Sequence, residues 1–213
     1  MKKQHALPMA LVGAGVGAAA GFVWLARSVN NHETRYVDGR ARKQFPKRRR
    51  RSTRLVADAL SPLGKWWGQM PLAAGLAALT WRTRGKHAAL PIAGASASAA
   101  ALAWVLERAL PQRVPPPGRH SPTEPAFPSG HSLQTTAVAL TTAYILQQEY
   151  RTPRVATASL AVLLPIASGL GRIYLDRHWL TDVLGGYLLG VAIAAPALAG
   201  YQVAKPRRRF GRR

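Results

Sequence analysis

Long stretches without a charged residue are the feature that most constrains how this chain can fold. Six such stretches, rich in Ala, Leu, Gly and Val, alternate with short segments that hold most of the charge. A helix that crosses the hydrocarbon core of a bilayer needs ~20 apolar residues. The stretches are residues 6–26, 66–81, 88–106, 129–148, 155–171 and 183–204. They predict an all-α integral membrane bundle of about six transmembrane helices.

Two of these stretches have a second interpretation. The stretch at residues 66–81 is short, and it reaches spanning length only with the preceding segment, which Pro62 and Lys65 interrupt. Residues 1–26 have the charged start and apolar run of a secretory signal. Their apolar run is longer than the ~7–15 residues usual in a signal peptide, so we expect a first membrane helix instead.

The positive charge is concentrated in two segments. The net charge is +22, from 30 Lys and Arg against 8 acidic residues, and it gathers at residues 27–54 and 205–213. Basic segments beside membrane helices attract anionic lipid headgroups. Neither segment has an interleaved platform of aromatic residues or a recognisable nucleic-acid-binding module, so membrane lipids and not nucleic acid are the expected partners. The expected organisation is an N-terminal helix with a basic segment (1–54), a transmembrane core (55–204) and a basic tail (205–213).

The side on which each segment lies follows from the number of crossings. Six crossings place both chain ends and residues 82–87 and 149–154 on one side, which the positive-inside rule makes cytoplasmic. Residues 27–54, 109–128 and 172–182 then share the other side. Residues 27–54 hold eleven Lys and Arg, so the positive-inside rule would place this segment in the cytoplasm as well. The two assignments conflict, because six crossings put the segment on the opposite side. Either this basic segment is extracytoplasmic, or one of the first two stretches does not cross.

Two polar motifs fall on this second side. "PSGH" at residues 128–131 opens the fourth stretch, and "RIYLDRHWLTD" at residues 172–182 leads into the sixth. The first N–H groups of a helix are unpaired and lie at the positive end of its dipole, so they attract anions. Ser129 and Gly130 therefore form a candidate phosphate-binding site, in which glycine allows the backbone a close approach.

The charged and histidine side chains of these motifs suggest a reaction. Asp182 follows His178 by four residues, so a helix places both on one face. A carboxylate that accepts the Nδ1–H of His178 leaves Nε2 free to attack. His131 can protonate the leaving oxygen, while Arg172 and Arg108 neutralise phosphoryl charge. His131 alone would be an ordinary interfacial residue, but an Asp inside an apolar helix costs ~2.5–3.5 kcal/mol and indicates function.

The two motifs resemble those of the type 2 phosphatidic acid phosphatase superfamily, a group of integral membrane lipid phosphatases. The resemblance covers roughly residues 54–202. It implies that His178 is the nucleophile and forms a phosphohistidine, that Asp182 orients it, and that His131 is the general acid. It also implies that the reaction uses no metal and no other cofactor.

A third motif of this family is incomplete here. In the family it has a Lys, six further residues and then Arg-Pro, whereas this chain has Arg108 in the Lys position and Pro115 in place of the Arg. We expect Arg113 or Arg119 to supply the missing cation, because a guanidinium binds phosphate through two hydrogen bonds. Without a substitute, the missing contact would cost ~3–4 kcal/mol of transition-state stabilisation.

The sequence therefore predicts a phosphatase that acts on a phosphate monoester or pyrophosphate of a lipid. Candidate substrates are phosphatidic acid, phosphatidylglycerol phosphate and a polyprenyl diphosphate. We expect it in a bacterial inner membrane, with the site on the extracytoplasmic face. A silent relative that binds lipid phosphate as a scaffold or subunit stays open, because of Pro115. A haloperoxidase or a phosphotransferase fits less well, because the known haloperoxidases with these motifs are soluble. A nucleic-acid binder also fits less well, because it leaves Asp182 inside an apolar helix unexplained. The identity of the lipid and the oligomeric state stay open.

Overall fold

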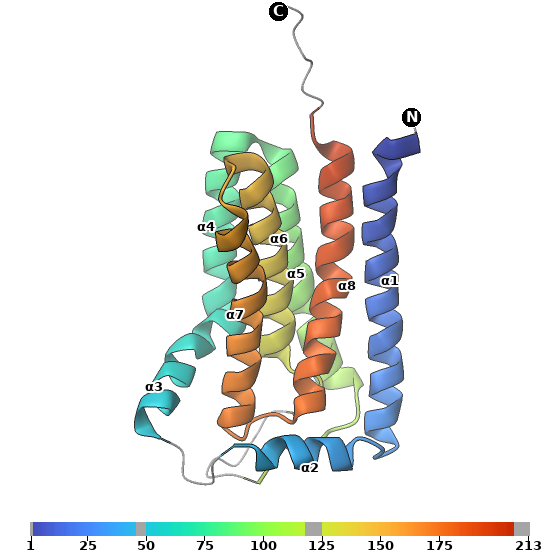
Figure 1. Cartoon of the computed structure of the whole chain (residues 1–213), viewed down its shortest axis with the longest axis vertical. Coiled ribbons are helices and arrows are strands. Elements are labelled where there is room, and N and C mark those ends of the chain that lie inside the picture. The colour runs from blue at the N-terminus through green and yellow to red at the C-terminus, as the bar shows by residue number, and fades with distance from the viewer. Residues whose placement is uncertain (1, 46–49, 118–124, 207–213) are drawn as a thin grey trace, which may run out of the picture.

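A computed structural model describes residues 2–45, 50–117 and 125–206, and helices are the regular secondary structure of these ranges. Six long helices run side by side along the long axis, and two short helices lie at one end (Figure 1). The expected all-α bundle is confirmed. The elements are α1 (Lys2–Asn30), α2 (Arg35–Lys43), α3 (Arg51–Leu60), the 3-10 turn η1 (Ser61–Gly64), α4 (Trp66–Arg84), α5 (Lys86–Ala109), α6 (Gly130–Tyr150), α7 (Arg154–Tyr174) and α8 (Leu180–Ala204).

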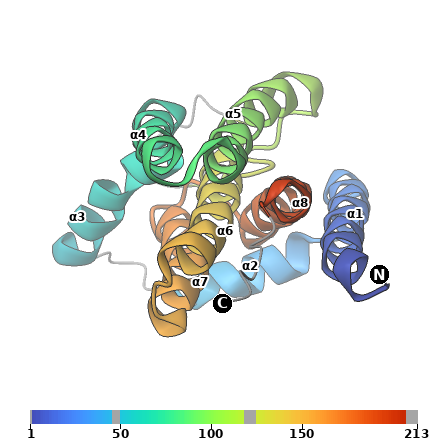
Figure 2. The same ribbon diagram turned by 90° about the horizontal axis from the view of Figure 1, so that it is seen from above.

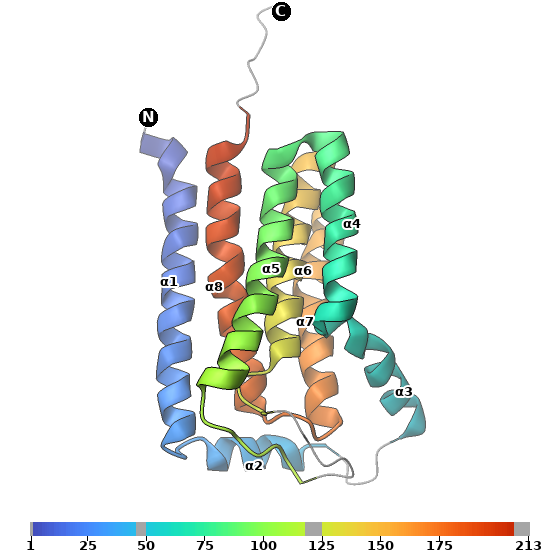
Figure 3. The same ribbon diagram turned by 180° about the vertical axis from the view of Figure 1, so that it is seen from behind.

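The predicted apolar stretches lie within the six long helices. Among the described residues, four helices are long and apolar enough to cross a membrane: α1 from Ala6 onward, α5, α7 and α8. The protein is thus an integral membrane protein. The other two long helices, α4 with 19 residues and α6 with 21, run alongside them (Figure 3). That these two also cross stays a prediction.

Helix α6 is less apolar because it is the inner helix of the bundle. It packs against α5, α7 and α8, and its buried polar side chains include Gln134, Thr135, Thr136, Thr141 and Thr142. Thr141 Oγ1 donates to the carbonyl oxygen of Ala137 at 2.8 Å. Side chains that face other helices do not have to be apolar, so the sequence of α6 has a lower hydropathy than those of the outer helices.

Helix α8 lies between α1 and α6, as the view along the bundle shows (Figure 2). Glycines let α8 approach α6 closely. A Cβ atom at position 186 would lie 2.5 Å from the carbonyl oxygen of Ser129, and one at position 190 would lie 2.5 Å from Cβ of Thr136. This close approach brings the first turns of α6 and α8 together, and those turns carry the two polar motifs.

Successive connections between the long helices lie at opposite ends of the bundle, as six crossings would predict. The start of α1, the end of α8 and the α4–α5 and α6–α7 connections lie at one end of the bundle (Figure 1). The α5–α6 and α7–α8 connections, together with α2, lie at the other end. The described part of the basic segment 27–54 therefore shares an end with both motifs, and α1 and α4 both run along the bundle. Residues 207–213 of the predicted basic tail lie outside the described residues.

The short helix α2 lies across the end of the bundle that carries the motifs. Its Asp38 is 2% exposed, although the helix is otherwise polar and largely exposed. Arg42, one turn later, donates through Nε to Asp176 Oδ1 at 3.1 Å and through Nη2 to the carbonyl oxygen of Pro117. Helix α2 is thereby attached to both connections that border the motifs.

Candidate active site

The first turns of α6 and α8 are joined by a backbone hydrogen bond. Ser129, the N-cap of α6, donates its N–H to the carbonyl oxygen of Asp182 at 3.0 Å. Its side chain accepts from the N–H of Ser132 at 3.4 Å. Gly130 is the first residue of α6, where N–H groups have no partner within the helix. The two predicted motifs are therefore brought together at one end of the bundle.

His178 is held by a backbone carbonyl. Its Nδ1 lies 2.7 Å from the carbonyl oxygen of Ala126, which can only accept, so Nδ1 carries the proton and donates. Asp182 Oδ2 lies 3.8 Å from the same Nδ1, close enough for charge interaction but beyond hydrogen-bond distance. We expected Asp182 itself to accept this hydrogen bond. The tautomer is instead fixed by Ala126, and in either case Nε2 keeps its lone pair.

The surroundings of His178 keep its imidazole neutral. The side chain is buried in the turn between α7 and α8. Burial lowers the pKa of His178 from 6.5 to about 3, and the positive charge of Arg172 contributes in the same direction. At neutral pH the ring is therefore unprotonated at Nε2. A neutral imidazole with one free nitrogen is what nucleophilic attack on phosphorus requires.

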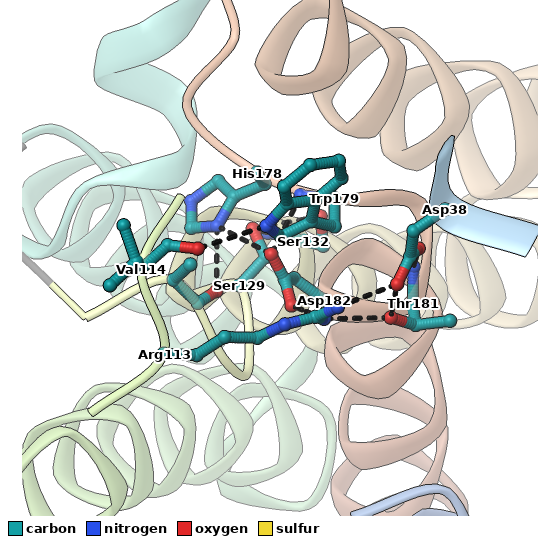
Figure 4. A network of polar contacts seen from close by, with 10 residues as sticks. Asp38, Arg113, Val114, Ser129, Ser132, His178, Trp179, Thr181 and Asp182 are labelled. Atoms are coloured by element: carbon teal, nitrogen blue, oxygen red, sulfur yellow. Dashed lines mark hydrogen bonds and ion pairs between the residues drawn. The ribbon is translucent and has the colours of Figure 1, made fainter. Parts of the chain in front are cut away.

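The carboxylate of Asp182 is fully buried and has two hydrogen-bond donors. Its Oδ2 accepts the N–H of Trp179 at 2.6 Å, an interaction within the first turn of α8. Its Oδ1 accepts from Nη1 of Arg113 at 2.5 Å. Figure 4 shows these contacts, with Arg113 reaching Asp182 from the α5–α6 connection. The orientation of this carboxylate is thus set from two sides.

Arg113 bridges two carboxylates. Besides Asp182, its Nη2 contacts Oδ2 of Asp38 at 2.6 Å, and its Nη1 donates to Thr181 Oγ1 at 2.8 Å. The connection that carries Arg113 is held by Trp179, whose Nε1 donates to the carbonyl oxygen of Val114 at 3.0 Å (Figure 4). We expected this guanidinium to bind phosphate, but its donors are directed at Asp38, Thr181 and Asp182.

A second cluster joins α7, α6 and η1. The guanidinium of Arg172, 3% exposed, donates through Nη1 to Ser61 Oγ at 3.3 Å. The same oxygen lies 3.2 Å from Nε2 of His131. The charge of Arg172 acts on both His131 and His178. The two histidines and this arginine are therefore close together, as the motifs predicted.

Arg108 lies apart from this cluster. It stands near the end of α5 and is exposed, with its guanidinium carbon 4.1 Å from the centre of the Trp104 ring. Its Nη1 donates to the carbonyl oxygen of Trp104 at 2.9 Å. Its position near the end of α5 directs the side chain outward, so the predicted contact of Arg108 with phosphate stays a prediction. Arg119, the other suggested cation, lies outside the described residues.

Several site residues were not predicted from the sequence. Asp38 is an acid within a basic segment, and Ser61 precedes a helix that the sequence marked only as doubtful. The charges of Lys65 and Arg177 act on His131, and that of Arg177 also acts on His178. Of these residues, Arg177 alone had a signal in the sequence, because it directly precedes His178 within the second motif. The others depend on contacts between distant segments.

A cavity of about 530 Å³ opens beside Arg113, between the end of α1, α2 and the α5–α6 connection. One part of its lining is apolar and another is polar. The apolar residues include Ala26, Val29, Leu110 and Phe127, and the polar ones include Asn30, Thr34, Arg35 and Gln112. Because Trp179 and Arg113 also line it, the cavity adjoins the segment that holds His178 and Asp182.

Comparison with known proteins gives three similarities. Residues 85–206 match the PAP2 superfamily. A stretch of 71 residues is 34% identical to phosphatidylglycerophosphatase B of Bacillus subtilis strain 168, and this match spans 32% of the chain and 35% of that protein.

The fold is similar to the crystal structure of a transmembrane PAP2-type phosphatidylglycerolphosphate phosphatase from Bacillus subtilis, with a TM-score of 0.79. The alignment covers 92% of this chain and 98% of that one, at 23% sequence identity. At this identity the likeness establishes the shared fold. Helices α1 and α2, which precede the matched residues 85–206, belong to the part of the chain that the PAP2 match does not include.

Proposed function

The chain belongs to the PAP2 superfamily, and on that premise we propose that it is a lipid phosphatase that works through a phosphohistidine at His178. The observation that carries the proposal is the state of this imidazole. Its Nδ1 donates to the Ala126 carbonyl, its pKa is lowered to about 3 by burial, and Nε2 is left as the nucleophile. A histidine with a purely structural role would not need an unprotonated Nε2 near the positive charges of Arg172 and Arg177.

The proposed reaction has two steps. In the first, Nε2 of His178 attacks the phosphorus, the bond to the leaving oxygen breaks, and His131 transfers a proton to that oxygen. In the second, water attacks the phosphohistidine, His131 takes a proton from the water, and the bond to Nε2 breaks to release inorganic phosphate. Asp182, 3.8 Å from Nδ1, supplies the negative charge that offsets the positive imidazole of the intermediate.

The phosphate-binding part of the site would consist of Arg172 and the first N–H groups of α6 at Ser129 and Gly130. Arg172 supports this role because its side chain is buried and its positive charge acts on both histidines. A buried guanidinium interacts with a phosphoryl group far more strongly than an exposed one. Arg177 is a second cation for the same group, because its charge also acts on both histidines.

The substrate we propose is a phosphorylated membrane lipid, such as phosphatidic acid, phosphatidylglycerol phosphate or a polyprenyl diphosphate. The site lies at one end of a transmembrane bundle, where a lipid headgroup would meet it. The adjoining cavity, with apolar and polar parts, suits the headgroup region of such a lipid. Its basic surroundings in segment 27–54 suit anionic lipid headgroups in general.

We place the site on the extracytoplasmic face of a bacterial inner membrane. The opposite end of the bundle carries the start of α1, the end of α8 and the basic helix ends with Arg82, Arg84 and Arg154, which the positive-inside rule assigns to the cytoplasm. Segment 27–54 opposes this rule, but part of its charge has partners within the protein. Arg42, for example, is engaged by Asp176.

A second candidate function is favoured by one observation. Pro115 replaces a family arginine, Arg108 faces away from the site, and Arg113 is engaged by two carboxylates. A site with fewer free cations would hold a lipid phosphate without turning it over. In that case the protein would be a binding subunit or scaffold.

Trapping of the phosphoenzyme tests the proposal and separates it from the scaffold. The purified protein is mixed with a lipid labelled in its terminal phosphate and quenched in base, in which phosphohistidine is stable and phosphoserine is not. We expect label on wild-type protein and none on His178→Ala. A scaffold would retain the lipid without covalent label. Label that persists in His178→Ala would refute the assignment of the nucleophile.

A further inference from the structure

Asp38 closes a ring of contacts around the first turn of α8. Its Oδ1 accepts the N–H of Thr181 at 2.9 Å, and its Oδ2 lies 2.8 Å from Thr181 Oγ1. Oδ2 also contacts Nη2 of Arg113 at 2.6 Å. Arg113 in turn donates to Asp182, the residue after Thr181, which completes the ring (Figure 4).

The ring fixes Arg113 more firmly than Asp182 alone would. An arginine side chain has high rotamer entropy, and a single carboxylate partner leaves its other nitrogens free to rotate toward a phosphate. Here one nitrogen is bound to Asp38 and the other to Asp182 and Thr181. The hydrogen bond that Arg113 gives to Asp182 therefore depends on Asp38.

The negative charge of Asp38 also offsets part of the positive charge that Arg113 places near His178. The positive charge of Arg113 acts on His178, and it opposes a positive charge on the imidazole. The imidazole of His178 gains positive charge when Nε2 attacks phosphorus, because Nδ1 keeps its proton. A carboxylate 2.6 Å from Arg113 offsets that unfavourable charge. This offset has its effect mainly as the transition state is reached, when the imidazole becomes charged.

We propose that Asp38 is a positioning residue of the reaction, which holds Arg113 on Asp182 and thereby sets the charge around His178. The proposal rests on the proposed function. Asp38 lies in α2, outside the matched residues 85–206, and thus adds a site residue from a part of the chain that the PAP2 match does not include.

The test compares kcat and KM of Asp38→Asn with those of the wild type. Asn keeps the shape and can still accept the Thr181 N–H through its Oδ1, but it loses the charge and the second oxygen that accepts from Arg113. Loss of a residue that orients a metal ligand lowers activity by about 10- to 100-fold, and we take the same scale for a residue that orients a reacting group. We expect a fall of about this size in kcat with KM within about three-fold, because the lost interaction acts in the transition state.

Three control variants separate positioning from other effects. Arg42→Ala removes the other attachments of α2, to Asp176 and to the carbonyl oxygen of Pro117, and is expected to change kcat by less than about three-fold. Glu33→Gln removes an exposed carboxylate of the same segment and is expected to have no effect. In an Arg113→Gln background, Asp38→Asn is expected to add little, because Asp38 acts through Arg113. Equal losses in Arg42→Ala and Asp38→Asn would overturn the proposal.

A second measurement makes the result independent of turnover. The imidazole ¹⁵N resonances of His178 report the tautomer and the charge around Nδ1. We expect Asp38→Asn and Arg113→Gln to shift them alike, and Arg42→Ala to leave them unchanged. If the wild type showed these resonance shifts but had no phosphatase activity, the proposed function would be refuted, while the positioning of Asp182 by Asp38 through Arg113 would stand. An active wild type whose kcat and resonances are unaffected by Asp38→Asn would refute the positioning alone.

Discussion

The Nδ1 of His178 donates to the carbonyl oxygen of Ala126 at 2.7 Å, while the carboxylate of Asp182 lies 3.8 Å from the same nitrogen. Two tasks that are often combined in one carboxylate are thus divided. The backbone carbonyl fixes the tautomer of the imidazole, and Asp182 contributes negative charge. This division predicts how the site responds when the charge alone is removed.

Asp182→Asn is expected to lower kcat by about 10- to 100-fold. In a triad where the carboxylate alone fixes the tautomer, the same change costs about 10⁴-fold. Here the tautomer is kept by Ala126, so only the charge and the Arg113 contact are lost. The measurement is steady-state turnover of phosphatidylglycerol phosphate. A loss of 10⁴-fold would mean that Asp182, not Ala126, determines the tautomer during the reaction.

The arginines of the incomplete motif are expected to differ in importance. Arg113→Ala should lower kcat by about 100-fold or more, since it leaves the buried carboxylates Asp38 and Asp182 without their common partner. Arg108→Ala should be close to wild type, because Arg108 is exposed and contacts Trp104 of its own helix.

Arg119→Ala should be less damaging than Arg113→Ala, and it serves as the matched loss of one arginine from the same connection. Turnover of all three variants is measured at equal amounts of folded protein. If Arg119→Ala or Arg108→Ala were the most damaging, the missing cation of the family motif would come from that residue.

Acid should destabilise the fold through His178. Burial lowers the pKa of this histidine to about 3 in the folded protein, whereas it is 6.5 in the unfolded chain. Between pH 6.5 and pH 3 the unfolded state therefore binds a proton that the folded state does not, and stability falls as pH falls. At about 1.36 kcal/mol per pKa unit, the loss amounts to a few kcal/mol by pH 3.

Thermal unfolding in detergent between pH 7 and pH 4 measures this effect. The wild type should lose stability faster than His178→Asn as the pH is lowered, because the variant lacks the titrating group. Other groups contribute equally to both curves. Parallel curves would mean that His178 accepts a proton in the folded protein at ordinary pH.

The close approach of α8 to α6 should be sensitive to a single methyl group. Gly186→Ala would place a Cβ 2.5 Å from the carbonyl oxygen of Ser129, so we expect a loss of ~1–3 kcal/mol and reduced turnover. Gly200→Ala, on the same helix, meets no atom within 4 Å and should be neutral or slightly stabilising. Thermal midpoints of both variants are compared. Equal midpoints would mean that the two helices are not packed this closely.

The orientation in the membrane can be measured by cysteine labelling, because the chain has no cysteine of its own. Glu33→Cys lies in the exposed turn at the site end, and Arg151→Cys lies in the exposed turn at the other end. A membrane-impermeant maleimide should label Glu33→Cys in intact cells and Arg151→Cys only after permeabilisation. The reverse pattern would place the site in the cytoplasm.

The architecture was predictable because it depends on hydrophobic length. A long stretch without charge has to be helical in a bilayer, since its backbone groups find partners only within the helix. Alternation of the helix ends then brings residues 128–131 and 172–182 to the same end. The convergence of His131, His178 and Asp182 follows from local spacing together with this alternation.

Contacts between distant segments were not predictable in the same way. Asp38 is surrounded in sequence by basic residues, so the pattern indicated a solvated arm, whereas its side chain is buried against Arg113. Motif spacing assigned Arg108 to the phosphate but does not specify the direction of its side chain. The acceptor at Ala126 is a backbone atom, which any residue type could supply.

Release of inorganic phosphate by the detergent-purified protein tests the central claim most directly. Phosphatidic acid, phosphatidylglycerol phosphate and undecaprenyl diphosphate are supplied separately in EDTA, with folded His178→Ala as the matched control. We predict release from at least one lipid by the wild type and none by the variant. No release from any of the three by folded wild-type protein, or equal release by His178→Ala, would contradict a histidine-based lipid phosphatase.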